Sequence, residues 1–191
     1  LGYLICYKIF GLSPAGFHLV SIGLHAAVVC LLFFLTRRIF GERMLAVGTA
    51  ALFALHPIHS ESVTWIAAVT DLELMAFYVL TFWLFLDLGR FKGVRLVLLQ
   101  TAMMASFALA LLSKEQAVTL PFLATVYEHF YRGDRAETTG LRKFSRYFPL
   151  WVLALAYIPL RLFALGGFVV TSNHWGMTRV ETILSALALT G

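Results

Sequence analysis

Two histidines and three carboxylates stand close together between two strongly apolar runs of the chain. The histidines are His56 and His59 of a His-Pro-Ile-His-Ser-Glu segment, and the carboxylates are Glu61, Asp71 and Glu73. Imidazoles and carboxylates together can bind hydroxyl groups, move protons or hold a metal ion. Because polar residues are costly to bury in an apolar chain, this segment is the first candidate for a functional site.

The spacing of these residues disfavours a dedicated metal site. His56, His59 and Glu61 have ligand-type side chains, but they do not form a His-Glu-x-x-His motif, and Pro57 interrupts the helix that such a motif needs. The sequence therefore predicts no cofactor, with a divalent metal as the less favoured alternative. We expect the three side chains to order the segment or to hydrogen-bond a hydroxyl-rich or phosphorylated ligand.

Other polar side chains lie inside apolar runs or at their ends. Lys114 and Glu115 directly follow one run, and Arg161 lies within another. Lysine and arginine bind phosphate well, although a long basic side chain at a helix end can instead extend to the lipid headgroups. His18 and His25 lie near one face of the same predicted helix, where they either pack with a hydrogen-bonding partner or line a polar cavity.

The composition of the chain indicates an integral membrane protein. Of its 191 residues, 60% are hydrophobic and 13% are charged, whereas soluble domains have about 25% charged residues. The mean hydropathy is +0.84. The net charge of +5 is not gathered in a basic stripe with interleaved aromatics, which disfavours a nucleic-acid partner. Cys6 and Cys30 lie in apolar segments and predict no disulfide. We interpret the chain, which opens at Leu1 and closes in an apolar run, as a fragment of a longer protein.

The apolar runs predict an all-α, polytopic transmembrane helical bundle that forms one membrane domain over residues 1–191. Residues 1–14 are expected to form an interfacial helix and a turn. Six spans are predicted, at 17–36, 44–56, 72–86, 94–112, 117–131 and 147–165, with the start of a seventh from Thr182. The second span has roughly 18 Å of helix, against about 30 Å of bilayer core. The histidine segment after it is therefore expected to dip below the membrane surface and to line a polar cavity.

The basic residues predict the orientation of the bundle. They gather in alternate connections, which face the cytoplasm by the positive-inside rule. These residues are Arg37, Arg38, Arg43, Arg90, Lys92, Arg95, Arg132, Arg135, Arg142, Lys143 and Arg146. Segments 56–71, 113–116 and 166–181 then face the periplasm or an organelle lumen. Asp87 and Glu128, at cytoplasmic ends of spans, are expected to be solvated.

Two short patterns predict the first turns of helices on the non-cytoplasmic side. Thr70 with Glu73, and Ser113 with Gln116, have the spacing of capping boxes. The helix dipole favours acidic residues in a first turn, so capping alone explains part of the acidity of this region. Helix N-termini near Lys114 would also favour binding of a phosphate or another anion.

Several segments, in this order, resemble the TMTC-like O-mannosyltransferases and their bacterial relatives. These are polytopic GT-C glycosyltransferases, often with tetratricopeptide repeats after the membrane part. The matching segments are 16–20, 24–26, the His-Pro segment 55–63, Asp71 with Leu72, 112–116 with Thr119, and Tyr157 to Arg161. The chain departs from the family at Val69, where relatives often have a basic residue, and at Ser113, where cysteine is common.

The resemblance implies an active site on the non-cytoplasmic side, a lipid-phosphate-linked sugar as donor and a protein or glycan as acceptor. It also implies that the catalytic base lies in a loop ahead of Leu1, so the catalytic residues of this fragment are unknown. The residues expected to bind the donor phosphate are Lys114, Arg161 and Glu115. The residues expected to line the cavity are His18, His25, His56, His59, Glu61 and Asp71.

Two other classes of protein stay open from the residues alone. A transporter or channel would show broken helices in matched halves, and no inverted repeat is visible in the sequence. The second alternative is a non-catalytic membrane scaffold. A pair of acidic residues just outside a first span would favour the enzyme over the scaffold. The bacterial inner membrane is the favoured location, with the endoplasmic reticulum membrane as the eukaryotic equivalent.

Overall fold

The computed structural model describes residues 2–133 and 139–165 and divides the chain into two compact units, Leu1–Leu155 and Ala156–Gly191. The described residues form helices and no strand, which confirms the all-α prediction. In chain order the elements are α1 (Gly2–Phe10), α2 (Pro14–Phe40), α3 (Arg43–Leu55), α4 (Ile58–Thr64), the 3-10 helix η1 (Ile66–Ala68), α5 (Val69–Asp87), α6 (Val94–Ser113), the 3-10 helix η2 (Glu115–Thr119), α7 (Leu120–Val126), the π-helix η3 (Tyr127–Tyr131) and α8 (Gly140–Leu165).

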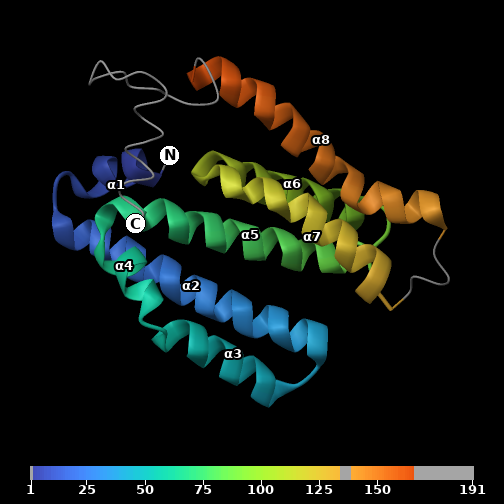
Figure 1. Ribbon diagram of the computed structural model, residues 1–191, viewed down its shortest axis with the longest axis horizontal. Coiled ribbons are helices and arrows are strands. Elements are labelled where there is room, and N and C mark those ends of the chain that lie inside the picture. The colour runs from blue at the N-terminus through green and yellow to red at the C-terminus, as the bar shows by residue number, and fades with distance from the viewer. Residues whose placement is uncertain (1, 134–138, 166–191) are drawn as a thin grey trace, which may run out of the picture. The chain divides into compact units, whose positions relative to one another are not determined.

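Helix α5 lies at the centre of the first unit and packs against α2 on one side and α6 on the other (Figure 1). Its buried side chains include Leu72, Val79, Phe82 and Phe85, and α6 contributes Met103 and Phe107. One polar contact joins the two helices inside this apolar core. Thr81 Oγ1 donates to Ser106 Oγ over 3.0 Å, and Ser106 Oγ donates to the Phe77 carbonyl over 3.0 Å. Such hydroxyl contacts join neighbouring helices where the surroundings are apolar.

Four of the described helices are long and apolar enough to cross a membrane: Pro14–Phe40, Ile66–Asp87, Val94–Ser113 and Gly140–Ala164. They contain the spans predicted at 17–36, 72–86, 94–112 and, but for its last residue, 147–165. Helix α3 has 13 residues, so it is as short as the sequence suggested. Residues 115–131 form η2, α7 and η3 in succession instead of one regular α-helix. The number of spans therefore stays a prediction, and segments 166–181 and 182–191 lie outside the described residues.

The described parts of the predicted basic connections lie at one end of the first unit. In Figure 1 the chain turns from α2 to α3 and from α5 to α6 at the right, where η3 also ends. Helices α1 and α4 and the junction of α6 with η2 lie at the opposite end. Basic residues in alternate connections require such an arrangement, in which these connections share one end. The assignment of that end to the cytoplasm stays a prediction.

Both predicted capping boxes are wrong. Helix α5 begins at Val69 directly after η1, and the Val69 N–H donates to the Ile66 carbonyl, so Thr70 is not an N-cap. Ser113 is the last residue of α6, where its hydroxyl donates to the Leu109 carbonyl over 2.8 Å. Capping therefore does not explain why two acidic residues, Asp71 and Glu73, lie near the start of α5.

Candidate functional site

The turn between α2 and α3 determines where the histidines lie. Gly41 has a left-handed backbone (φ 78°) and its N–H donates to the Arg37 carbonyl, which ends α2 and returns the chain as α3. Helix α3 ends at Leu55 because His56, which precedes Pro57, has an extended backbone (ψ 127°). A helix as short as α3 reaches only part of the way back along the 27 residues of α2.

The histidine segment consequently meets α2 near its middle. The rings of His59 and His25 have centroids 6.0 Å apart. His25 lies roughly 16 Å along α2 from Pro14 and roughly 22 Å from Phe40, at 1.5 Å per residue. If α2 spans the bilayer, these imidazoles lie at the depth of the hydrocarbon. That the segment dips into the membrane stays a prediction. Polar groups at that depth need protein or water beside them.

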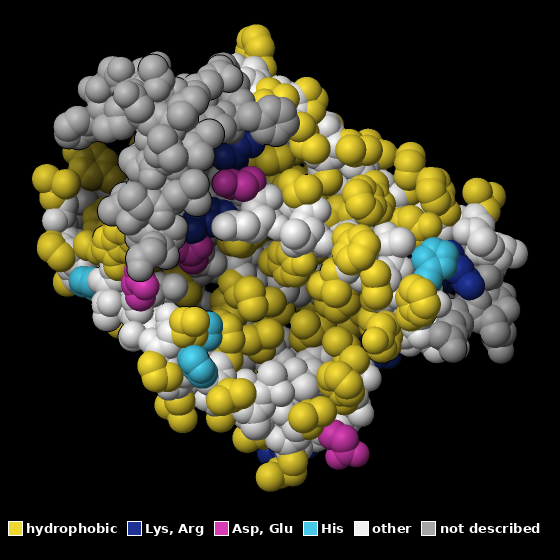
Figure 2. All heavy atoms as spheres, viewed as in Figure 1, with side chains coloured by type: hydrophobic (Ala, Val, Ile, Leu, Met, Phe, Trp, Pro, Cys, Tyr) yellow, Lys and Arg dark blue, Asp and Glu magenta, His cyan; other side chains and the backbone are white. Residues whose placement is uncertain are grey.

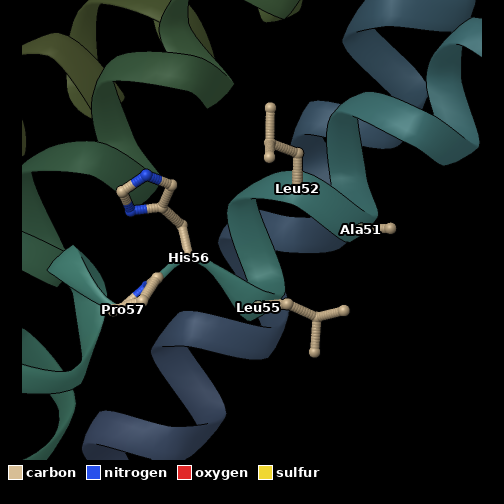
Figure 3. Close-up of a pocket in the computed structure, with 5 residues that line it drawn as sticks. All are labelled: Ala51, Leu52, Leu55, His56 and Pro57. Atoms are coloured by element: carbon tan, nitrogen blue, oxygen red, sulfur yellow. The ribbon is translucent and has the colours of Figure 1, made fainter.

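A cleft of about 340 Å³ opens beside these rings, and we call it the histidine cleft. It is lined by His25, Ala54, Leu55, His56, Pro57, His59, Ser60, Val63 and Thr64. Phe53 packs against His59 with centroids 4.0 Å apart and stacks on His25 at 5.6 Å. A neighbouring hollow of about 350 Å³ shares His56, and Figure 3 shows the His56 ring and the Leu55 side chain pointing to opposite sides of the chain.

Hydrogen bonds fix the turn that presents the histidines. The Ile58 N–H donates to His56 Nδ1 over 3.2 Å, and Ser60 Oγ donates to the Pro57 carbonyl over 2.6 Å. Burial, and after it the nearby imidazoles of His25 and His56, lower the pKa of His59. His59 is therefore neutral at pH 7 and can both donate and accept a hydrogen bond. Among the described residues, no group of three or more His, Cys, Asp or Glu side chains is arranged to hold a metal ion.

A second polar cluster lies where α5 begins and α6 ends. Lys114 Nζ forms an ion pair with Asp71 Oδ1, and both side chains are partly accessible, at 32% and 40% exposure. Figure 2 shows acidic and basic side chains lying near one another toward the upper left of the view. The partner of Asp71 thus comes from a residue 43 positions away, which the sequence did not indicate.

Helix α1 is docked on the same cluster. The Tyr3 hydroxyl donates to the Ile66 carbonyl over 2.6 Å. Burial, followed by the carboxylates of Glu73 and Asp71, raises the pKa of Tyr3, so this hydroxyl stays protonated. The Glu73 carboxylate lies so close to Gly2 that a Cβ at position 2 would overlap it. Glu73 therefore faces α1.

A family model described as dolichyl-phosphate-mannose-protein mannosyltransferase matches residues 3–163 of the chain. The chain belongs to this family. The protein O-mannosyl-transferase tmtc2 of Xenopus laevis is 33% identical over 132 residues, which cover 68% of this chain and 16% of that protein. The protein O-mannosyl-transferase TMTC3 of Mus musculus is 32% identical over 133 residues, 68% of this chain and 14% of that protein. The resemblance to TMTC-like proteins predicted from the sequence is confirmed.

The chain spans only a small part of the relatives that it matches. The protein O-mannosyl-transferase Tmtc1 of Drosophila melanogaster, 32% identical over 121 residues or 62% of this chain, is matched over 14% of its length. No solved structure matches the chain. The histidines of the first cluster, and Lys114 and Asp71 of the second, lie within residues 3–163, the region that the family model matches.

The remaining predicted site residues are His18, Glu61, Glu115 and Arg161. His18 is on α2 and is absent from the ring contacts of the other three histidines. Glu61 on α4 and Glu115 at the start of η2 are exposed. Arg161 belongs to the second unit, where its Nη1 donates to the Tyr157 hydroxyl over 2.9 Å. A phosphate site shared by Lys114 and Arg161 therefore stays a prediction.

Sequence reasoning missed a buried charge cluster at the basic end of the first unit. Glu128 is completely buried, with Arg146 Nη1 2.6 Å from Oε1 and Arg132 Nε 2.6 Å from Oε2. Arg132 Nη2 also donates to the Phe85 carbonyl over 3.0 Å. The expectation that Glu128 is solvated is wrong, because two arginines compensate its charge. Asp87, expected to be solvated as well, is 18% exposed and pairs with two arginines.

Proposed function

We propose that this membrane glycosyltransferase chain supplies donor-binding residues for the transfer of a sugar from a polyprenyl phosphate to a protein or glycan hydroxyl. The reaction takes place on the non-cytoplasmic side, at the end of the first unit where α5 begins. The observation that supports this proposal best is the Lys114–Asp71 pair. This pair places a partly exposed ammonium group where α5 begins and α6 ends, in a chain that belongs to a mannosyltransferase family.

The transfer requires one bond to form and one to break at the anomeric carbon. The acceptor oxygen attacks this carbon, and the bond from the carbon to the phosphate oxygen breaks, so polyprenyl phosphate leaves. The acceptor proton passes to a carboxylate that the family resemblance assigns to the region ahead of Leu1. Negative charge grows on the departing phosphate, and a fixed cation beside it lowers the barrier.

Lys114 suits this role because Asp71 holds its side chain in place. Lys114 is the extended residue between α6 and η2, and the aspartate that fixes its ammonium group comes from the first turn of α5. A phosphate that approaches this exposed pair can share the ammonium protons with Asp71, since an ammonium group has three donors. Asp71 then acts as a positioning residue, and Lys114 contacts the donor.

The experiment uses the full-length protein in lipid nanodiscs with a polyprenyl-phosphate-linked sugar as substrate. Lys114→Ala is expected to lower kcat/KM for the donor by about 10- to 100-fold, which corresponds to about 1.4–2.8 kcal/mol. Lys114→Arg should retain more of the activity, because it keeps the charge. Lys92→Ala, which removes an exposed lysine outside the polar cluster, is the matched control. A donor kcat/KM equal to that of the wild type in Lys114→Ala would refute the assignment.

A further inference from the structure

An apolar groove runs between α2 and α3, and we call it the α2–α3 groove. It has a volume of about 370 Å³ and is lined by Val29, Cys30, Phe33, Phe34, Val47, Ala50, Ala51 and Ala54. The three alanines leave space on the α3 side opposite the two phenylalanines of α2. The volume falls in the range of about 300–1,000 Å³ that is usual for ligand pockets.

The groove adjoins the histidine cleft. Ala54 lines both of them, and Ala51 lines both the groove and the hollow beside His56 (Figure 3). One wall of the groove is α2, which is among the described helices long and apolar enough to cross a membrane. An apolar groove that adjoins a cleft with polar side chains matches a ligand with a long apolar chain and a polar head.

The chemistry of the cleft determines what kind of head it can receive. Among the described residues that line the cleft there is no Lys, Arg, Asp or Glu. An anionic head would lose its hydration there without gaining a cation, which is costly. The polar groups are imidazoles and the hydroxyls of Ser60 and Thr64, and these hydroxyls donate to the Pro57 and Ser60 carbonyls. Nδ1 of His56 already accepts the Ile58 N–H, so the rings of His25 and His59 and Nε2 of His56 are the groups that can exchange hydrogen bonds with a ligand hydroxyl.

We propose that the α2–α3 groove and the histidine cleft together bind one lipid alcohol. Its single long chain lies in the groove, and its uncharged hydroxyl-bearing head lies among His25, His56 and His59. Lys114 lines neither the groove nor the cleft, so this lipid is distinct from the phosphate-linked donor. The proposal does not depend on the transfer reaction and can be tested by binding alone.

The experiment uses the full-length protein in nanodiscs and a geranylgeraniol that carries a photoreactive diazirine. The expected result is labelling of peptides from α2 and α3. Unlabelled geranylgeraniol should compete at least about tenfold better than geranylgeranyl monophosphate, since an unpaired anion in the cleft costs more than 1.4 kcal/mol. His59→Phe, which keeps a ring but removes both nitrogens, should reduce this preference for the alcohol.

Two variants fill the groove and one serves as their control. Ala51→Trp, and the milder Ala54→Leu in case the first does not fold, should lower labelling of α2 and α3 by about tenfold or more. Ala105→Trp enlarges an exposed alanine of α6 and should leave labelling unchanged. Labelling confined to other segments, equal competition by the monophosphate, or no labelling because another helix covers the groove would each overturn the proposal.

Discussion

Neutralising Glu128 should destabilise the protein far more than neutralising any exposed carboxylate. Glu128 is completely buried, and its two oxygens each lie 2.6 Å from an arginine nitrogen. Glu128→Gln keeps the size of the side chain but leaves two arginines, 9% and 5% exposed, without the carboxylate. Removing one partner of a buried ion pair costs about 3–5 kcal/mol.

The contacts of Arg132 favour the lower end of this range. Its Nη2 donates a hydrogen bond to the Phe85 carbonyl over 3.0 Å. Its guanidinium lies over the rings of Phe85 and Tyr127, at 5.2 and 5.7 Å from their centroids. These contacts continue to compensate part of its charge after the carboxylate is gone. We therefore expect Glu128→Gln to lower the free energy of unfolding by about 3 kcal/mol.

The measurement is unfolding of the purified full-length protein by SDS in mixed micelles, followed by circular dichroism. Asp87→Asn is the matched control: this carboxylate is 18% exposed and lies 3.2 Å from nitrogens of Arg38 and Arg90, so its loss should cost about 1 kcal/mol or less. Replacing Glu128, Arg132 and Arg146 together by Leu, Met and Met should recover much of the stability. If Glu128→Gln and Asp87→Asn lower the free energy of unfolding by the same amount, the buried cluster does not stabilise the protein more than a partly exposed ion pair does.

Three further outcomes follow from the contacts. Cysteines introduced at Ser60 and Gly133 should react with a membrane-impermeant maleimide from opposite sides of the membrane, and labelling of both from one side would contradict the topology. A double-mutant cycle with Asp71→Asn and Lys114→Gln should give a coupling free energy of about 0.5–1 kcal/mol for this partly exposed pair, whereas strictly additive effects would mean that the pair does not form. Because the pKa of His59 is lowered in the folded state, the unfolded chain binds the proton more tightly. Stability should therefore fall as the pH falls below about 6.5, and the slope should be smaller in His59→Phe; an unchanged slope would show that another group is responsible.

Apolar runs were enough to predict the long helices, because a segment that crosses or fills a membrane domain must be apolar over many consecutive residues. The short length of α3 likewise followed from counting residues before His56. The contacts of the polar residues were harder to predict from the sequence. The spacing of Thr70 and Glu73 fits a capping box, but the pattern could not show that η1 precedes α5 and already accepts its first N–H.

Glu128 illustrates the same difficulty at the other end of the first unit. Its spacing from Arg132 allows an ion pair within one helical turn, and this was the only signal in the sequence. The second partner, Arg146, comes from α8, and the accompanying carbonyl of Phe85 comes from α5. Contacts between elements distant in the chain decide whether such a carboxylate is solvated or buried, and a local pattern contains no information about them.

The two polar clusters of the first unit differ in charge, and both proposals rest on this difference. The cluster where α5 begins contains the Lys114–Asp71 ion pair and the carboxylate of Glu73. Among the described residues that line the histidine cleft there is no Lys, Arg, Asp or Glu. Of the described residues in these two clusters, those where α5 begins include a cation for the phosphate of the proposed donor, and those of the histidine cleft are neutral groups that fit the proposed lipid alcohol. If both proposals hold, exchanging Lys114 for alanine should weaken the phosphate-linked donor and leave the lipid alcohol bound, and His59→Phe should do the reverse.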